Sequence, residues 1–325
     1  MRVPLFRAVF LCLLVTTALG ITTVRAQGYP SKPVRIVVPY APGGASDILA
    51  RVIAQKLSES WAQQVIVDNR AGAGGTIGTD LVAKSAADGH TVLLADVATV
   101  TISPALYPKL PYSEKDLAPV IIVATFPHVL IAPGSTPFKS LKDVVAGDKQ
   151  SPGKLNIASA GNGTSSHLTA ELLKSASGLA LTHVPYKGGG AAITDVVGGR
   201  VDLMFIGTPP AMAHIRSGAL KALAVTTAAR SASLPDVPTV IEAGYAAFES
   251  LAAQGILAPA ATPKEAIAKL NAEVARILRL PDVRERWAQL GVETMDNTPE
   301  QFSQWARDEL DKWGKVIRDS GTKVD

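Results

Sequence analysis

Three glycine-rich segments of this 325-residue chain carry side chains and backbone groups that could bind an anion. Each segment follows a predicted strand and precedes a predicted helix, and in parallel α/β sheets ligands bind at the carboxyl ends of strands. A helix start presents free N–H groups and about half a positive charge, so such a loop can hold a carboxylate without Lys or Arg. The segments are 39–47, 158–167 and 184–190.

The first segment reads Pro-Tyr-Ala-Pro-Gly-Gly-Ala-Ser-Asp. Its prolines restrict the backbone, its glycines let N–H groups approach a ligand, and its serine can cap the next helix. The residues expected to contact a ligand here are Tyr40, Ala41, Gly43, Gly44, Ser46 and Asp47. The alternative is that Gly-Gly-Ala-Ser is only a tight turn.

The second segment, 158–167, is the most informative one. Its small residues leave room for a ligand, and several hydroxyls converge with the free N–H groups of the helix start. The expected contacts are Ser159, Gly161, Gly163, Thr164, Ser165 and His167. Because Ser and Thr are also ordinary N-caps, a purely structural role remains open.

The third segment, 184–190, leads into a predicted helix. Tyr186 could form one wall of a cleft, whereas Lys187 is expected to be a solvated surface lysine. Asp202 falls inside an apolar strand, where an unpaired carboxylate would be costly to bury. It either caps a neighbouring loop or accepts a hydrogen bond from a ligand, and we keep it among the candidate contacts.

Two other kinds of site were weighed. Gly72, Gly74 and Gly78, with Asp96 after the next strand, are similar to a dinucleotide-binding pattern, but their spacing is not G-x-G-x-x-G and another strand and helix precede them. A hydrolase could use Ser165 or Ser166 with His167, although neighbouring residues at a helix start point in different directions. The five histidines show no metal-ligand spacing. We therefore expect no cofactor, no metal and no enzyme activity.

Short β-branched runs alternate with helical stretches along the chain, a pattern typical of α/β units built on parallel sheets. One series of elements spans 34–95, and a second begins after 121–123 with a strand expected at 129–132 and continues to 226. Two helices, beginning near 262 and near 302, finish the chain. We predict a first lobe from 27–124 with 227–325 and a second lobe from 125–226, joined by a hinge.

The first 26 residues are typical of a secretory signal peptide, with Arg2 and Arg7 before an apolar run and Val24-Arg25-Ala26 at its end. Cleavage near Ala26 would remove Cys12, the only cysteine, so the mature protein could form no disulfide. It would also leave 29 basic residues against 28 acidic ones. With 5% aromatic residues and no basic run, nucleic-acid binding is excluded. We expect a periplasmic protein.

These loops resemble those of a known family, the periplasmic Bug or TctC-like receptors of tripartite tricarboxylate transporters. The resemblance covers nearly all of the mature chain and is carried by five motifs. They are the Pro-Tyr-Ala-Pro-Gly-Gly loop with Asp47, Asn69-Arg70-Ala71-Gly72-Ala73-Gly74-Gly75, Gly161-Asn162-Gly163-Thr164-Ser165-Ser166-His167-Leu168, Pro185-Tyr186-Lys187-Gly188 and Leu234-Pro235-Asp236-Val237-Pro238-Thr239. One departure is Ser103 before Pro104, where relatives often have Asn, which puts contacts from 101–103 in doubt.

The resemblance implies a two-lobed periplasmic-binding-protein (Venus flytrap) fold, each lobe a mostly parallel sheet flanked by helices. It further implies a small carboxylate ligand, aliphatic or aromatic, gripped by the 161–167 loop and reached by the 40–47 loop partly through water. The implied partners are the large and small membrane subunits of the transporter, with the receptor itself a monomer. The alternative is an exported hydrolase of small carboxylate esters or amides.

Overall fold

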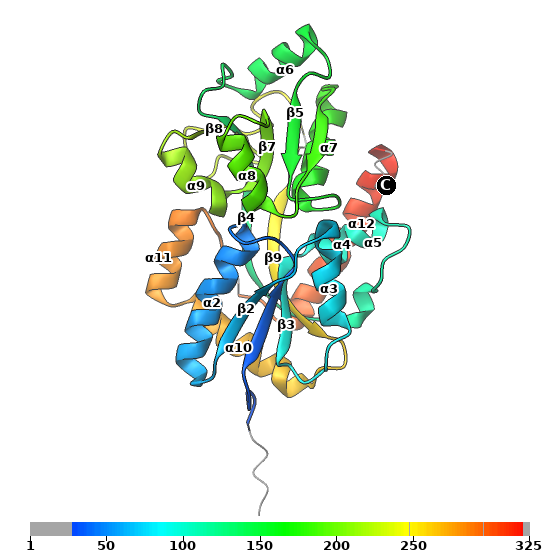
Figure 1. Ribbon diagram of the computed structural model, residues 1–325, viewed down its shortest axis with the longest axis vertical. Coiled ribbons are helices and arrows are strands. Elements are labelled where there is room, and N and C mark those ends of the chain that lie inside the picture. The colour runs from blue at the N-terminus through cyan, green and yellow to red at the C-terminus, as the bar shows by residue number, and fades with distance from the viewer. Residues whose placement is uncertain (1–27, 247, 295, 321–325) are drawn as a thin grey trace, which may run out of the picture.

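The computed structural model describes residues 28–246, 248–294 and 296–320, which form two α/β lobes stacked along the long axis (Figure 1). The predicted signal peptide lies outside these residues. The strands follow the order β2-β1-β3-β9-β4-β7-β5-β6, with β8 paired to β4. The two-lobed α/β fold predicted from the sequence is confirmed.

The first lobe contains β1 (Val34–Val38), β2 (Val65–Asn69), β3 (Thr91–Asp96), β9 (Leu251–Pro259) and the first part of β4 (Leu117–Pro133). β1, β2 and β3 run parallel, and β9 runs antiparallel to both β3 and β4. Its helices are α2 (Ala45–Trp61), α3 (Thr76–Ala83), α4 (Ala98–Thr101), α5 (Ser103–Leu106), α10 (Lys264–Leu278), α11 (Pro281–Leu290) and α12 (Pro299–Ser320), with 3-10 turns η1 (Ala73–Gly75) and η2 (Glu114–Asp116).

The second lobe contains the end of β4 with β5 (Asn156–Ser159), β6 (Thr182–Pro185), β7 (Leu203–Gly207) and β8 (Leu220–Val225). β5 pairs in parallel with β6 and β7, while β4 runs antiparallel to β7 and β8. Its helices are α6 (Leu141–Gln150), α7 (Ser165–Ser177), α8 (Gly189–Val197) and α9 (Thr208–Arg216). Each lobe is therefore mostly parallel with one reversed strand, as predicted.

One long strand, β4, passes from the first lobe into the second. Its residues up to Pro127 pair with β9, and from His128 onward it pairs with β7 and β8. The strand predicted at 129–132 is the end of this longer strand, which continues across Pro127 and exchanges its partners there. One connection between the lobes is thus a continuous strand.

The return to the first lobe comes later than the sequence suggested. Leu234, Val240 and Phe248 are buried in the hydrophobic clusters of the second lobe, and β9 starts only at Leu251. We therefore propose that the second lobe extends to about residue 250, in place of the boundary predicted after 226. The chain also ends in three helices, because α11 separates the two that were expected.

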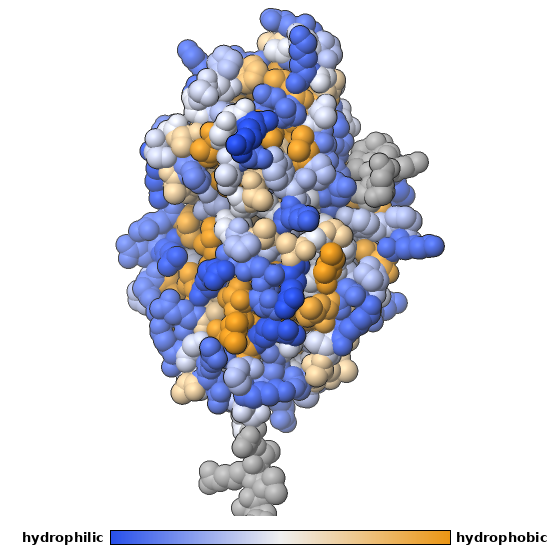
Figure 2. Space-filling model, in the orientation of Figure 1, coloured by the Kyte–Doolittle hydropathy of each residue, from blue (hydrophilic) through white to orange (hydrophobic). Residues whose placement is uncertain are grey.

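The cores of the two lobes are separate, and the C-terminal helix joins them. Trp313 and Ile317 of α12 pack against Leu168 of α7 in a small cluster of their own. Figure 2 shows hydrophilic residues over most of the viewed face, with smaller apolar areas between them. Within the described residues, no helix has both the length and the apolar character that a membrane crossing requires.

Candidate functional site

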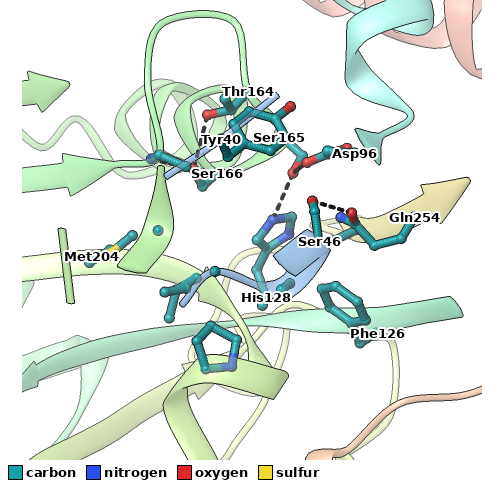
Figure 3. Close-up of a pocket in the computed structure, with 18 residues that line it drawn as sticks. Tyr40, Ser46, Asp96, Phe126, His128, Thr164, Ser165, Ser166, Met204 and Gln254 are labelled. Carbon is teal, nitrogen blue, oxygen red and sulfur yellow. Dashed lines mark hydrogen bonds between the residues drawn. The ribbon is translucent and has the colours of Figure 1, made fainter. Parts of the chain in front are cut away.

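A cavity of about 490 Å³, mouth included, lies between the lobes, beside the paired strands β4 and β9 (Figure 3). The 18 residues that line it come from both lobes. They are Tyr40, Gly44, Ala45, Ser46, Asp96, Phe126, His128, Ala160, Thr164, Ser165, Ser166, Gly189, Met204, Ile206, Gly207, Pro210, Ala252 and Gln254.

The turn before α2 brings Tyr40, Gly44 and Ser46 to the cavity, three of the six residues predicted there. Asp47 does not line the cavity. Its carboxylate accepts hydrogen bonds from the Gly43 N–H at 2.9 Å, from Arg51 at 2.8 Å and from Asn69 at 3.0 Å. Burial alone would raise the pKa of Asp47, but these hydrogen bonds outweigh it and lower that pKa. Asp47 thus fixes the shape of the turn.

The start of α7 brings Thr164, Ser165 and Ser166 to the same cavity. The first N–H groups of this helix have no acceptor within the helix, so they are available to an anion. All three side chains are at least 95% buried. In Figure 3 they lie together with Tyr40 on one side of the cavity, and Phe126 lies on the other.

Four predicted contacts in this segment do not line the cavity, namely Ser159, Gly161, Gly163 and His167. They stabilise the loop before α7 through hydrogen bonds within it. The Ser159 hydroxyl accepts from the Gly161 N–H at 3.1 Å, and His167 Nδ1 accepts from the Gly163 N–H at 3.2 Å. The His167 ring stacks on His183 with 4.1 Å between the ring centroids. Burial lowers the pKa of His167 to about 4, so its ring is neutral and can accept the Gly163 N–H. Direct ligand contact by these four residues stays a prediction.

The third loop meets the first loop across the cleft. The Ala41 N–H donates to the Lys187 carbonyl at 2.9 Å, and Gly189 lines the cavity. Tyr186 lies outside the cavity, and its hydroxyl donates to Asp195 at 2.7 Å. Asp202 accepts from the Asn156 N–H at 2.9 Å, which corresponds to the loop-capping role considered for it.

The Tyr40 hydroxyl is the one feature of this site that points directly to a ligand. Tyr40 is 7% exposed, and its hydroxyl is buried without a hydrogen-bond partner. A buried polar atom that lacks a partner costs about 1–3 kcal/mol. Burial, followed by the nearby Asp96, raises the pKa of Tyr40 well above its usual value, so the group stays a hydrogen-bond donor. An acceptor on a bound molecule would satisfy it.

Four polar lining residues were not predicted as ligand contacts from the sequence, namely Asp96, His128, Ser166 and Gln254. Asp96 and Gln254 are paired neighbours on β3 and β9, and His128 lies on β4. Ser46 donates to Gln254 Oε1 at 2.6 Å. The available signal was a buried polar residue within each apolar strand, but only long-range strand pairing shows that they meet.

Ser165, His128 and Asp96 are the residue types of a hydrolytic triad, yet their order differs. The Ser165 hydroxyl lies in the middle, with His128 Nε2 at 3.1 Å on one side and Asp96 Oδ2 in a short contact on the other. In a triad the imidazole lies between the carboxylate and the nucleophile. Here the Ser165 hydroxyl donates to Asp96, and the base considered for it, His167, accepts from the Gly163 N–H. This geometry suits binding better than nucleophilic attack.

The cavity offers a carboxylate neutral hydrogen-bond donors, and its lining also contains one acidic residue, Asp96. The described lining residues include no lysine or arginine, and burial lowers the pKa of His128 to about 4, so its ring is uncharged near pH 7. The positive end of α7 and the Tyr40 hydroxyl supply the attraction instead. Among the described residues, no group of three or more His, Cys, Asp or Glu is placed to hold a metal ion.

Comparison with known proteins finds one family and several close relatives. The family model described as tripartite tricarboxylate transporter family receptor matches residues 49–322. Protein BugT of Bordetella pertussis (strain Tohama I) is 39% identical over 312 residues, which is 95% of this chain and 96% of that protein.

Two solved structures with bound acids share the fold. MatC from Rhodopseudomonas palustris with bound malate superposes with a TM-score of 0.85 at 34% identity, over 89% of this chain and 100% of that one. Rpa4515 of R. palustris with adipate gives a TM-score of 0.87 at 33% identity, over 90% of this chain and 98% of that one.

Proposed function

The chain belongs to the tripartite tricarboxylate transporter receptor family, and from this premise we propose that it captures a small organic carboxylate between its lobes. It then delivers this acid to the large and small membrane subunits of a tripartite tricarboxylate transporter. It works as a monomer in the periplasm, after removal of its signal peptide. The closed form of the two lobes is the shape that the membrane subunits recognise.

A single observation carries the binding proposal. The partnerless Tyr40 hydroxyl of the first lobe and the start of α7 in the second lobe border the same cavity. One carboxylate can accept hydrogen bonds from both, so binding favours closure of the lobes. A ligand shifts such an equilibrium only by its different affinities for the open and closed states.

The remaining walls indicate the chemistry of the rest of the ligand. Phe126, Met204 and Ile206 form apolar walls, while Ser46 and Gln254 add one polar spot. A short carbon chain or a ring with a second oxygen-bearing group fits this lining. The relatives solved with malate and with adipate support dicarboxylates as the first ligands to try, and aromatic acids come next.

Titration calorimetry of the mature protein with mono-, di- and tricarboxylates and aromatic acids tests this proposal. We expect saturable binding of one molecule per chain for at least one free acid, without turnover. Failure of every acid to bind would contradict the proposal. A parallel incubation with esters and amides of the same acids tests the hydrolase alternative, because release of free acid would support that function.

A further inference from the structure

A chain of hydrogen bonds runs from Asp96 away from the proposed carboxylate site. Asp96 Oδ2 contacts the Ser165 hydroxyl, which lies 3.1 Å from His128 Nε2. His128 Nδ1 lies 3.3 Å from the Ser250 hydroxyl, and that hydroxyl lies 2.6 Å from Thr169 Oγ1. All five residues are at least 92% buried. The binding mode proposed for the carboxylate uses Ser165 but leaves the acidic end of this chain unexplained.

The surroundings of Asp96 offer no cation to balance a second negative charge. Tyr40 faces it from the turn before α2, His128 from β4 and Ser165 from α7, while Glu309 of α12 borders a small space behind it. The Ala98 N–H donates to Asp96 at 3.0 Å. The described residues that line the two spaces next to Asp96 include no lysine or arginine.

Asp96 and a bound acid would therefore compete as anions at the first residue of α7. Two carboxylates that share one poorly solvated site cannot both be ionised without a large energetic cost, and one of them takes up a proton. Burial already raises the pKa of Asp96, against the opposing hydrogen bonds from Ser165 and Ala98. A nearby ligand carboxylate acts in the same direction.

Resting on the proposed function, we propose that carboxylate binding is coupled to the uptake of one proton by Asp96. The receptor then binds an acid anion together with one proton, and this proton cancels one negative charge of the ligand in the closed cleft. Asp96 is a positioning residue in this scheme, since it acts on the ligand through Ser165.

The hydrogen-bond chain can accept this proton without moving its heavy atoms. With Asp96 ionised, Ser165 donates to Asp96, and His128 donates through Nε2 to Ser165. With Asp96 protonated, Asp96 donates to Ser165, Ser165 donates to His128 Nε2, and His128 Nδ1 donates to Ser250. Both patterns use the same contacts and keep the His128 ring neutral, in agreement with its lowered pKa.

Calorimetric titration in buffers with different ionisation enthalpies measures the protons taken up per ligand bound. Malate and adipate are the probes, between pH 6.5 and pH 9, where both acids are fully ionised. We expect uptake that reaches about one proton per bound acid, and an affinity that falls about tenfold per pH unit where uptake is complete. Saturable binding with zero uptake across this range would overturn the inference and leave the proposed function standing. Absence of any binding would overturn both.

Asp96→Asn identifies the group that takes the proton, because it keeps an acceptor for Ser165 and removes the titration. We expect this variant to bind without proton uptake and without the fall in affinity at high pH. The matched control is Asp148→Asn, at a buried aspartate of α6 that accepts from the Gly153 and Ala180 N–H groups, outside the cavity. It should take up protons as the wild type does. Unchanged proton uptake in Asp96→Asn would contradict the assignment of the proton to Asp96. If either variant fails to fold, the titration of the wild type still tests the coupling of binding to proton uptake.

Discussion

Replacing Tyr40 by Phe is expected to weaken carboxylate binding by about tenfold to a hundredfold, because hydrogen bonds to charged groups contribute about 1.5–3 kcal/mol. The free energy of unfolding should stay the same or rise slightly. The Tyr40 hydroxyl is buried without a partner in the free protein, so its removal costs the fold nothing. Calorimetry with the best acid and chemical denaturation of the free protein measure the two effects.

Tyr112→Phe is the matched control for this prediction. Tyr112 is 6% exposed, much as Tyr40 is, but its hydroxyl donates to the Thr99 carbonyl at 2.7 Å, outside the cavity. This substitution should lower the free energy of unfolding by about 1 kcal/mol and leave acid binding unchanged. If Tyr40→Phe bound the acid as tightly as wild type, the Tyr40 hydroxyl would have no part in the site.

Replacing Gly190 by Ala or Val is expected to reduce acid affinity by more than about a hundredfold, since one clash here opposes closure of the whole cleft. An added Cβ would lie 2.2 Å from the Pro42 carbonyl oxygen and 2.9 Å from the Gly43 carbonyl carbon, both backbone atoms of the opposite lobe. The clash with Pro42 and Gly43 is a contact between the lobes. Within a helix, Ala is favoured over Gly by about 1 kcal/mol. The free protein should therefore stay folded, with its lobes held apart.

Gly314→Ala in α12 is the control, because its added Cβ would meet only the Arg318 Nη1 atom at 3.4 Å and the Ala105 Cβ atom at 3.9 Å. It should bind acid as the wild type does. Small-angle X-ray scattering adds a second measurement. With acid present, the wild type should be more compact than Gly190→Val. Wild-type affinity in Gly190→Val would show that closure does not use this contact.

The sequence predicted the loops well because their signals are local. β1 ends at Val38, directly before the first glycine-rich segment, and α7 begins at Ser165, within the second one. Glycine, proline and hydroxyl residues between a strand and a helix restrict the backbone within a few positions. Tyr40, Gly44, Ser46, Thr164 and Ser165 were all predicted as contacts, and all five line the cavity.

The contribution of Asp96, His128 and Gln254 to the cavity could not be predicted, because it depends on contacts between distant strands. Asp96 lies opposite Gln254 only through the pairing of β3 with β9. His128 enters the cavity because β4 exchanges its partners next to Pro127. No local pattern encodes either event.

Prolines also caused elements to be missed. α9 begins Thr208-Pro209-Pro210, and α11 begins at Pro281. Neither helix is predicted from the sequence, although proline is well tolerated in the first turn of a helix. Asp47 and His167 illustrate a different difficulty. Both are predicted ligand contacts that do not line the cavity, and each accepts a backbone N–H of its own loop. Their direct contact with a ligand stays a prediction.

A crystal structure of the mature protein with the tightest-binding acid tests the central claim most directly. We predict that one carboxylate group lies between the lobes, within hydrogen-bond distance of the Tyr40 hydroxyl and of N–H groups in the first turn of α7. An acid held on the outer surface, or in the cleft with its carboxylate turned away from α7, would contradict the account.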